Sequence, residues 1–192
     1  MMGRAFESLR HPAGWPAWLG IALCAALLGW SHTAAAASGA ELEQDARAAL
    51  EQLYEKQPET RFLAEQSSAV LVFPRILKAG LVVGAERGKG VLFRDDKPDG
   101  HYASTGLSYG LQAGAQAYGY ALFFMRESAT RALDDRNGWE IGVGPSVVLI
   151  DEGAARKLSS TTADHDIYAY VFGQKGLMAG IGVQGSKITK LD

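Results

Sequence analysis

The sequence predicts an α+β fold in which N-terminal helices pack on a strongly curved, mainly antiparallel, glycine-rich sheet or partial barrel. Apolar residues at helical spacing are confined to the start of the folded part. Short β-branched and aromatic runs follow them, without the strand–helix alternation that a parallel sheet requires. Glycine recurs every fourth residue in several runs, and residues four apart on a strand share a face. We therefore expect a sheet with one bare face, which can bend or accept a neighbour closely.

The first 37 residues have the pattern of an export signal. Two arginines precede an uncharged run over residues 17–30, which is shorter than the roughly 20 residues of a membrane span. Three alanines at 35–37 then offer a small-residue cleavage site. We expect residues 1–37 to be a signal peptide and residues 38–192 to form one domain, exported to the periplasm or cell envelope. Retention of the N-terminal segment as an uncut anchor is the alternative.

Composition excludes several classes of protein. The formal net charge is −2, which gives no global attraction for nucleic acid. The one cysteine, Cys24, lies inside the predicted signal, so the folded part has neither a disulfide framework, nor a thiol nucleophile, nor a cysteine metal site. An anionic partner would have to be met by a local patch of cations.

The coarse order of elements is helices first and strands afterwards. Leu42, Ala46, Leu50 and Leu53 give the first helix its apolar stripe, and Pro58 ends it. We expect the glycine faces to allow the curvature of the sheet and to accept this helix. The predicted helices cover residues 41–56, 59–66 and 127–133; about eight short strands cover residues 69–73, 79–85, 90–94 (a continuation of the preceding strand or the start of the next), 102–117, 118–125, 139–150 (one strand or a pair), 167–172, 176–183 and 187–191; residues 151–162 are predicted as a loop.

One motif suggests a hydrolase. Gly106 to Gly110 matches the G-x-S-x-G nucleophile elbow, with Ser108 as the nucleophile and His165 further along the chain. The elbow needs a sharp strand-to-helix turn, whereas apolar and small residues alternate through Ser108 up to Ala117. This alternation predicts that Ser108 lies in the middle of a strand, on the small-residue face. A serine hydrolase remains the less favoured alternative, and we predict no catalytic residues.

Two further motifs do not support a cofactor or a metal. Gly180–Gly185 matches G-x-G-x-x-G, but only seven residues follow, too few for the helix of a dinucleotide site. Asp164–Asp166 includes a histidine, but His101 is the only other histidine outside the predicted signal. We therefore predict neither a cofactor nor a metal site.

A group of cations is more informative. Arg75, Lys78, Arg87 and Lys89 lie within 15 positions, and Glu86 is the only acid among them. Adjacent strand ends would bring them together, where they could bind phosphate through charge-assisted hydrogen bonds. Near an anionic membrane each cation would contribute about 1 kcal/mol. An ordinary solvated rim is the alternative interpretation.

Three blocks of sequence resemble the SYLF domain, or Ysc84, family. They run over Val70–Gly80, with Gly84, Gly88 and residues 90–92 after them, then over Ser108–Gln116, and finally over Gly176–Ser186. In this order the blocks span most of the chain from about residue 42 to residue 188.

The resemblance implies a non-enzymatic module that binds anionic phospholipid or a membrane surface. Arg75 and Lys78 fall on the family's F-P-[KR]-x-x-K positions, so the resemblance assigns them to headgroup contact. Arg87 and Lys89 are added from charge and spacing. Fungal members also bind actin, but the predicted export signal and the lack of an SH3 or FYVE partner domain lead us to expect no actin binding here. An envelope protein–protein interaction or assembly module is the alternative function.

Overall fold

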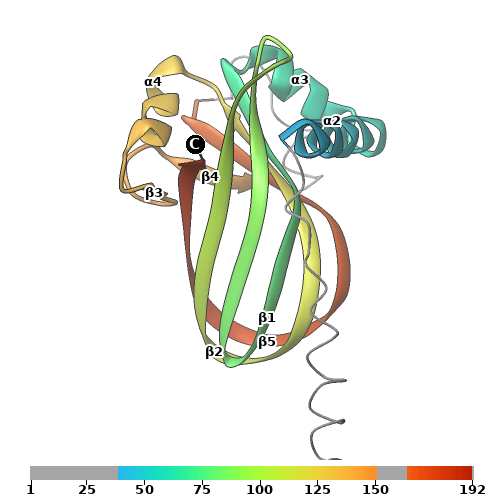
Figure 1. Cartoon of the computed structure of the whole chain (residues 1–192), viewed down its shortest axis with the longest axis vertical. Helices are drawn as coiled ribbons and strands as arrows, with labels where there is room; N and C mark the ends of the chain where they lie inside the picture. Colours follow the sequence, from blue (N-terminus) through green and yellow to red (C-terminus); the bar gives the residue numbers. More distant parts are fainter. Residues whose placement is uncertain (1–38, 151–163, 192) are drawn as a thin grey trace, which may run out of the picture. The chain divides into compact units, whose positions relative to one another are not determined.

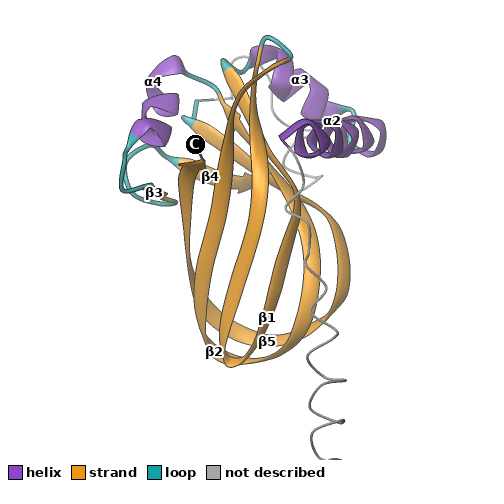
Figure 2. Cartoon of the chain, in the orientation of Figure 1, coloured by secondary structure: helices purple, strands orange, loops and turns teal. Residues whose placement is uncertain are grey.

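The computed structural model describes residues 39–150 and 164–191, and only the backbone of residues 111–112 and 179–184. The predicted signal peptide and the predicted loop at 151–162 lie outside the described residues. The described part is an α+β unit, with helices at one end of a strongly curled half-barrel sheet (Figures 1 and 2). The predicted fold class is thus confirmed.

The N-terminal helices follow the predicted bounds closely. α2 spans Gly39–Lys56 and α3 spans Glu59–Gln66. The apolar stripe of α2 is buried, as its helical spacing predicts. In the described part of the chain, no helix combines the length and the apolar character needed to cross a bilayer.

The sheet consists of three very long strands and two short ones. β1 (Ala69–Arg94), β2 (Lys97–Phe124) and β5 (Ile167–Leu191) pair antiparallel in that order. On the outer edge of β5, β3 (Trp139–Glu140) pairs antiparallel and β4 (Val147–Ile150) pairs parallel. The expectation of about eight short strands is wrong: a β-bulge absorbs the interruption that the sequence shows at Pro74, and the long strands continue through the other predicted gaps.

A short helical segment connects the hairpin of β1 and β2 to the outer edge of the sheet. α4 (Glu127–Thr130) continues into the 3₁₀ helix η1 (Arg131–Asp134), which agrees with the helix predicted at residues 127–133. The region predicted as one strand or a pair at residues 139–150 is a pair of short strands separated by a turn.

The long strands bend back on themselves, so that β1 contacts itself. We call residues 69–80 of β1, with the segments of β2 and β5 that pair beside them, the first arm, and residues 84–94 of β1 with their paired segments the second arm. A Cβ added at Gly90 would lie 2.5 Å from the Val72 carbonyl oxygen, and one at Gly88 would lie 2.6 Å from that of Arg75. The bend between the arms includes Val82, a β-branched residue at φ 62°. The bare glycine face is therefore what allows the two arms to cross.

The curl divides the apolar core between the two faces of the sheet. The outer core lies between the sheet and α2 and α3. The inner core lies inside the curl and is closed by α4, η1 and Trp139. Members of the outer core include Leu42, Ala46, Leu50, Val70, Val72, Val91, Phe93, Phe123 and Tyr168; members of the inner core include Leu71, Phe73, Ile76, Leu92, Tyr102, Tyr120, Leu122, Leu133 and Ile188.

One expectation about the glycines is wrong. They allow the curvature, but they do not accept the N-terminal helix, because α2 packs on the branched and aromatic residues of the outer core. Gly88 and Gly90 of the second arm pack against the first arm instead. The glycines at 138 and 142 are not in strands; they lie in turns with φ of +85° and +98°, which a side chain rarely adopts.

Candidate functional site

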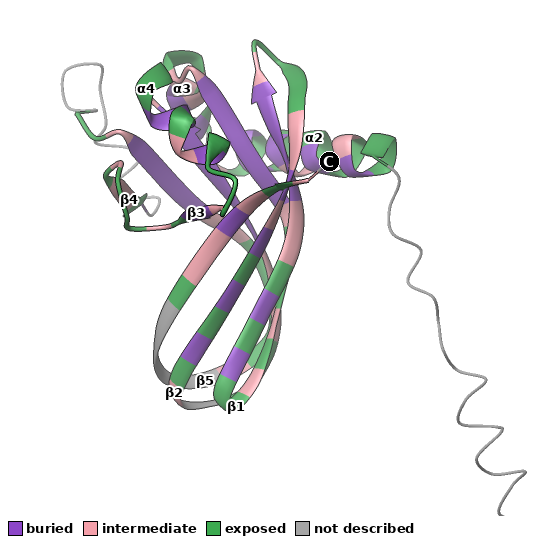
Figure 3. Ribbon diagram, turned by 60° about the vertical axis from the view of Figure 1, so that its left-hand side comes forward, coloured by how far each residue is buried: buried purple, intermediate pink, exposed green. Residues whose placement is uncertain are grey.

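In the second arm, inward and outward residues alternate along β2, as in any half-buried strand. Unusually, the inward residues are small and the outward ones are large. Gly106 and Ser108 face inward and are buried, whereas Leu107 and Tyr109 face outward and are 70% and 69% exposed. The alternating bands of exposure along the curled strands are visible in Figure 3. At Gly88 and Gly90 the arms approach to backbone contact, which leaves no room for a side chain at these two positions.

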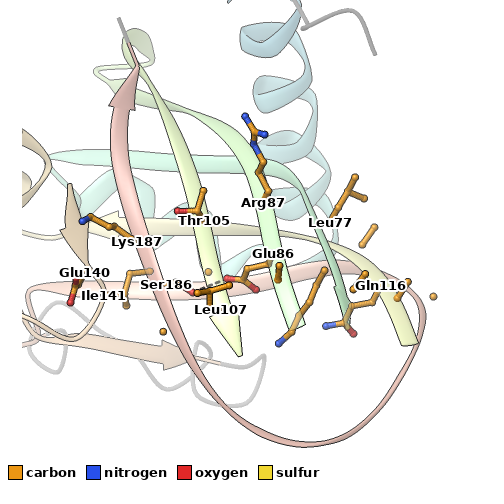
Figure 4. A pocket seen from close by; sticks show the side chains of 18 of the residues that line it. Leu77, Glu86, Arg87, Thr105, Leu107, Gln116, Glu140, Ile141, Ser186 and Lys187 are labelled. Atoms are coloured by element: carbon orange, nitrogen blue, oxygen red, sulfur yellow. Dashed lines mark hydrogen bonds between the residues drawn. The ribbon is translucent and has the colours of Figure 1, made fainter. Parts of the chain in front are cut away.

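Two cations meet on the outer face through the pairing register. Arg87 on β1 pairs with Thr105 on β2, and Thr105 pairs with Lys187 on β5. Residues directly opposite each other share a face of the sheet, so all three lie in one outward row. In Figure 4 Arg87 and Thr105 point to the same side, and Glu86 points elsewhere, toward Ser186. The row is a two-cation site with a hydroxyl between the charges.

The four cations predicted from the sequence do not share one face. Arg87 and Lys89 alternate with Gly88 and therefore share a face, which is the outer one. Lys78 lies two residues from the buried Ile76, on the inner face, where it lines a cavity. The Arg75 backbone contacts Gly88, and its side chain is exposed. The crossing of the arms thus brings the four into one region, but on both faces of the sheet.

A cavity of about 1220 Å³ lies at the curl. Its lining includes Lys78, Glu86 and Ser186 of the inner face and also Leu77, Arg87, Thr105, Leu107 and Lys187 of the outer face. At its wall is the buried carboxylate of Glu86, which accepts hydrogen bonds from the Tyr118 hydroxyl at 2.5 Å and the Ser186 hydroxyl at 2.7 Å (Figure 4 shows the second). A Cβ at Gly106 would lie 2.6 Å from Glu86 Oε1, so only glycine lets the carboxylate cross β2 to reach β5. Tyr118 belongs to the first arm, and this network therefore ties the two arms together.

A second hydroxyl pair reinforces the inner network. Tyr120 donates to Ser104 Oγ at 2.9 Å, again from one arm to the other. Burial raises the pKa of the Tyr120 phenol above its usual range, so at neutral pH it acts as a neutral donor. Together with the Glu86 network, this pair gives the curl a fixed polar interior, and we assign it a structural role.

The hydrolase alternative does not fit the structure. Ser108 is buried in the middle of β2, which continues to Phe124, so the strand-to-helix turn of a nucleophile elbow is missing there. His101 instead contacts Glu43 of α2 at 3.1 Å, and the His165 ring packs on Tyr168 at 5.9 Å. Gly180–Gly185 likewise lies within β5 and is not followed by a helix.

The described residues contain no group of three or more acidic, histidine or cysteine side chains that could hold a metal ion. Asp166 instead accepts hydrogen bonds from the amide and hydroxyl of Ser146 and from Arg126, which together lower the pKa of its carboxyl. This cluster holds the start of β4 beside the start of β5, and its role is structural.

Two cations of the site are missing from the sequence-based set. Lys187 stands in the row of Arg87, and Lys175 stands in the outward row of Leu77. Both come from β5, about 100 residues further along the chain, so charge density along the sequence gives no signal for them. The pairing register of β2 with β5 connects Lys187 to Arg87, and both lysines line the same cavity as Arg87.

A family model matches residues 105–192, that is, most of β2 and everything after it. The family is Ysc84, described as "Las17-binding protein actin regulator". No curated protein matches the chain. Lys175 and Lys187 lie inside the matched region, and the cations predicted on β1 lie before it. Residues 105–192 of the chain, slightly less than half of it, therefore match the Ysc84 (SYLF domain) family model.

Proposed function

We propose that this domain binds anionic phospholipid at a membrane surface, without catalysis. The observation that supports this most directly is the outward row of Arg87, Thr105 and Lys187, which presents two cations and a hydroxyl on one rigid sheet. Arginine and lysine both bind phosphate, arginine through two parallel N–H donors. Lys89 extends the row on the same face, and Arg75 and Lys78 flank it at the crossing of the arms.

The family match is consistent with a binding domain and does not identify the ligand. The formal charge of the chain is −2, so only a local group of cations can attract an anionic surface. We retain export to the periplasm or cell envelope as part of the proposal, with a bacterial anionic phospholipid as the ligand. The actin-related description belongs to the family, and we expect no actin binding by this chain.

Vesicle flotation with charge-reversal variants tests the proposal. Phosphatidylcholine vesicles with and without phosphatidylglycerol are compared for the unmodified chain and for Arg87→Glu/Lys187→Glu. Each cation near an anionic surface contributes about 1 kcal/mol, so losing two lowers the partition constant by at least about thirtyfold. The matched control is Arg131→Glu/Arg136→Glu, which makes the same charge change at two exposed arginines outside the row.

The two double variants separate location from net charge. We expect the unmodified chain and the control to float with the phosphatidylglycerol vesicles, and the Arg87/Lys187 variant to stay in the dense fractions. Equal recovery of all three proteins, or equal recovery on neutral vesicles, contradicts the proposal. In that case a stoichiometric envelope protein recovered by crosslinking, with either double variant, would support the alternative assembly function.

A further inference from the structure

The outer face at the curled end of the sheet has a cluster of exposed apolar side chains. Of the large apolar residues that are exposed in the described part of the chain, only Val143 and Leu149 lie elsewhere. Scattered exposed apolar residues are ordinary, but a contiguous group marks an interaction site. We call this group the outer apolar patch; its members are Leu77, Leu81, Val82, Val83, Leu107, Tyr109 and Leu177, with exposed fractions from 49% at Val82 to 89% at Leu177.

The patch results from how the sheet is built. Leu107 and Tyr109 alternate along β2 with the small inward residues Gly106 and Ser108, whereas Leu81, Val82 and Val83 are consecutive at the bend. A Cβ added at Gly106 would lie 2.6 Å from Glu86 Oε1, so a large side chain at that inward position would displace the Glu86 network. The large side chains of this part of β2 therefore occupy the outward positions.

The described helices do not cover the patch. α2 packs on the upper part of the same outer face, at Val72, Val91 and Phe93. In Figure 1 the helices lie at one end of the unit, and the strands curl at the other. The apolar stripe of α2 is itself buried in the outer core, so this helix has no free apolar face to insert into a membrane.

Cations lie beside the patch on both arms. On the second arm, Arg87 and Lys187 lie two residues along the strands from Leu107 and four from the row of Tyr109, which correspond to about 7 and 13 Å. On the first arm, Lys175 shares its row with Leu77. Going away from the bend, the second arm presents Val83 and Tyr109, then Leu107 and then the two cations, so apolar residues precede charges as hydrocarbon precedes headgroups in a bilayer.

We propose that the curled end of the sheet inserts its outer apolar patch into the hydrocarbon of an anionic phospholipid bilayer, to the depth at which Arg87 and Lys187 meet the phosphates. The inference rests on the proposed function and adds the part of the molecule that enters the membrane. A second copy is the less suitable occupant, because a symmetric contact through this patch would bring the same cations toward each other.

Depth-dependent quenching tests the insertion. Cys24, the one cysteine, is replaced by serine, and a nitrobenzoxadiazole probe is attached at Leu107→Cys or, as the control, at the exposed Ala48→Cys on α2. Phosphatidylglycerol vesicles carry nitroxides either on the headgroup or within the acyl chain. We expect the probe at 107 to shift to shorter wavelength and to be quenched more by the acyl-chain nitroxide, and the probe at 48 to show neither effect.

The result separates the two proposals. A protein that does not float with the vesicles contradicts the proposed function. A protein that floats, but whose probe at 107 stays unquenched by the acyl-chain nitroxide, overturns only the insertion.

A matched pair of apolar-to-acid variants provides the second measurement. Leu107 and Leu149 are 70% and 69% exposed, so replacing either by glutamate leaves the core intact. Leu107→Glu places a charge in the proposed hydrocarbon contact, and we expect at least a tenfold loss of vesicle partitioning; Leu149→Glu should leave partitioning unchanged. If Leu107→Glu instead abolishes self-association in sedimentation and leaves partitioning unchanged, the patch is an interface between copies and the insertion is refuted.

Discussion

Replacing Gly90 by alanine tests the crossing of β1 on itself. The added Cβ would lie 2.5 Å from the Val72 carbonyl oxygen and 2.7 Å from Phe73 Cδ1. Neither neighbour can move easily: Val72 is held in the ladder with β2, and the fully buried Phe73 ring stacks on Tyr120 at 4.7 Å. Overpacking of this kind costs about 1–3 kcal/mol.

Gly185→Ala is the matched control. It lies in β5 on the outer face, and a Cβ there would have no neighbour within 4 Å. Reduced freedom of the unfolded chain makes this change neutral or stabilising by up to about 1 kcal/mol. Urea unfolding followed by circular dichroism measures the free energy of unfolding of both variants, and the slope of that free energy against urea concentration should stay unchanged. Equal unfolding free energies for the two variants would refute the crossing of the two arms.

Three further predictions concern the polar groups. Glu86→Gln removes the charge that accepts two hydroxyl donors, and should lower the free energy of unfolding by about 1.5–3 kcal/mol in urea. The pKa of Asp166 is lowered in the folded state, so the stabilisation that its carboxylate provides is complete above the unfolded pKa of about 4 and is lost as pH falls through the folded pKa. In Asp166→Asn, the free energy of unfolding should therefore fall less steeply as the pH is lowered below about 4. Burial raises the pKa of Tyr102 to about 12, so tyrosinate absorbance should lag behind that of free tyrosine above pH 10, and the contribution of Tyr102 to stability should fall as pH rises from about 10 toward 12.

Each of these predictions has its own control. Ser186→Ala should cost less than Glu86→Gln, because it removes one hydrogen bond and leaves Tyr118 on the carboxylate. If Asp166→Asn lost stability at low pH as steeply as the unmodified chain, the role assigned to the Ser146 and Arg126 contacts would be contradicted. If every tyrosine of the folded protein titrated near pH 10, the burial of Tyr102 would be contradicted.

Local sequence patterns predicted the helices well. The strands were predicted less well, because their extent depends on pairing between distant parts of the chain. Pro58 and the apolar spacing before it mark the end of α2 and the start of α3, so their bounds could be predicted closely. Pro74 looked like the end of a strand because proline cannot donate to a ladder. In the structure it lies between Phe73 and Ile76 at a register shift, where a proline is tolerated within a continuing strand.

The candidate site was predictable only where it is local. Arg87 and Lys89 share a face because they are two residues apart on one strand, and this needs no tertiary information. Lys78 fell on the opposite face because it is an odd number of residues from Arg87 and the alternation keeps its phase across the bend, with Ile76 and Glu86 both buried. The alternation around Leu107 identified two faces but not which one turns inward, since this depends on the curl.

The contact of β1 with itself also has a kinetic consequence. Arg75 and Gly88 are only 13 residues apart, so closing the two arms costs little chain entropy and can occur soon after the hairpin forms. Thr105 and Lys187, by contrast, must meet across more than 80 residues before β5 can dock on β2. A folding intermediate should therefore contain the curled β1–β2 hairpin with the edge of β2 still open, and docking of β5 should be the slow step.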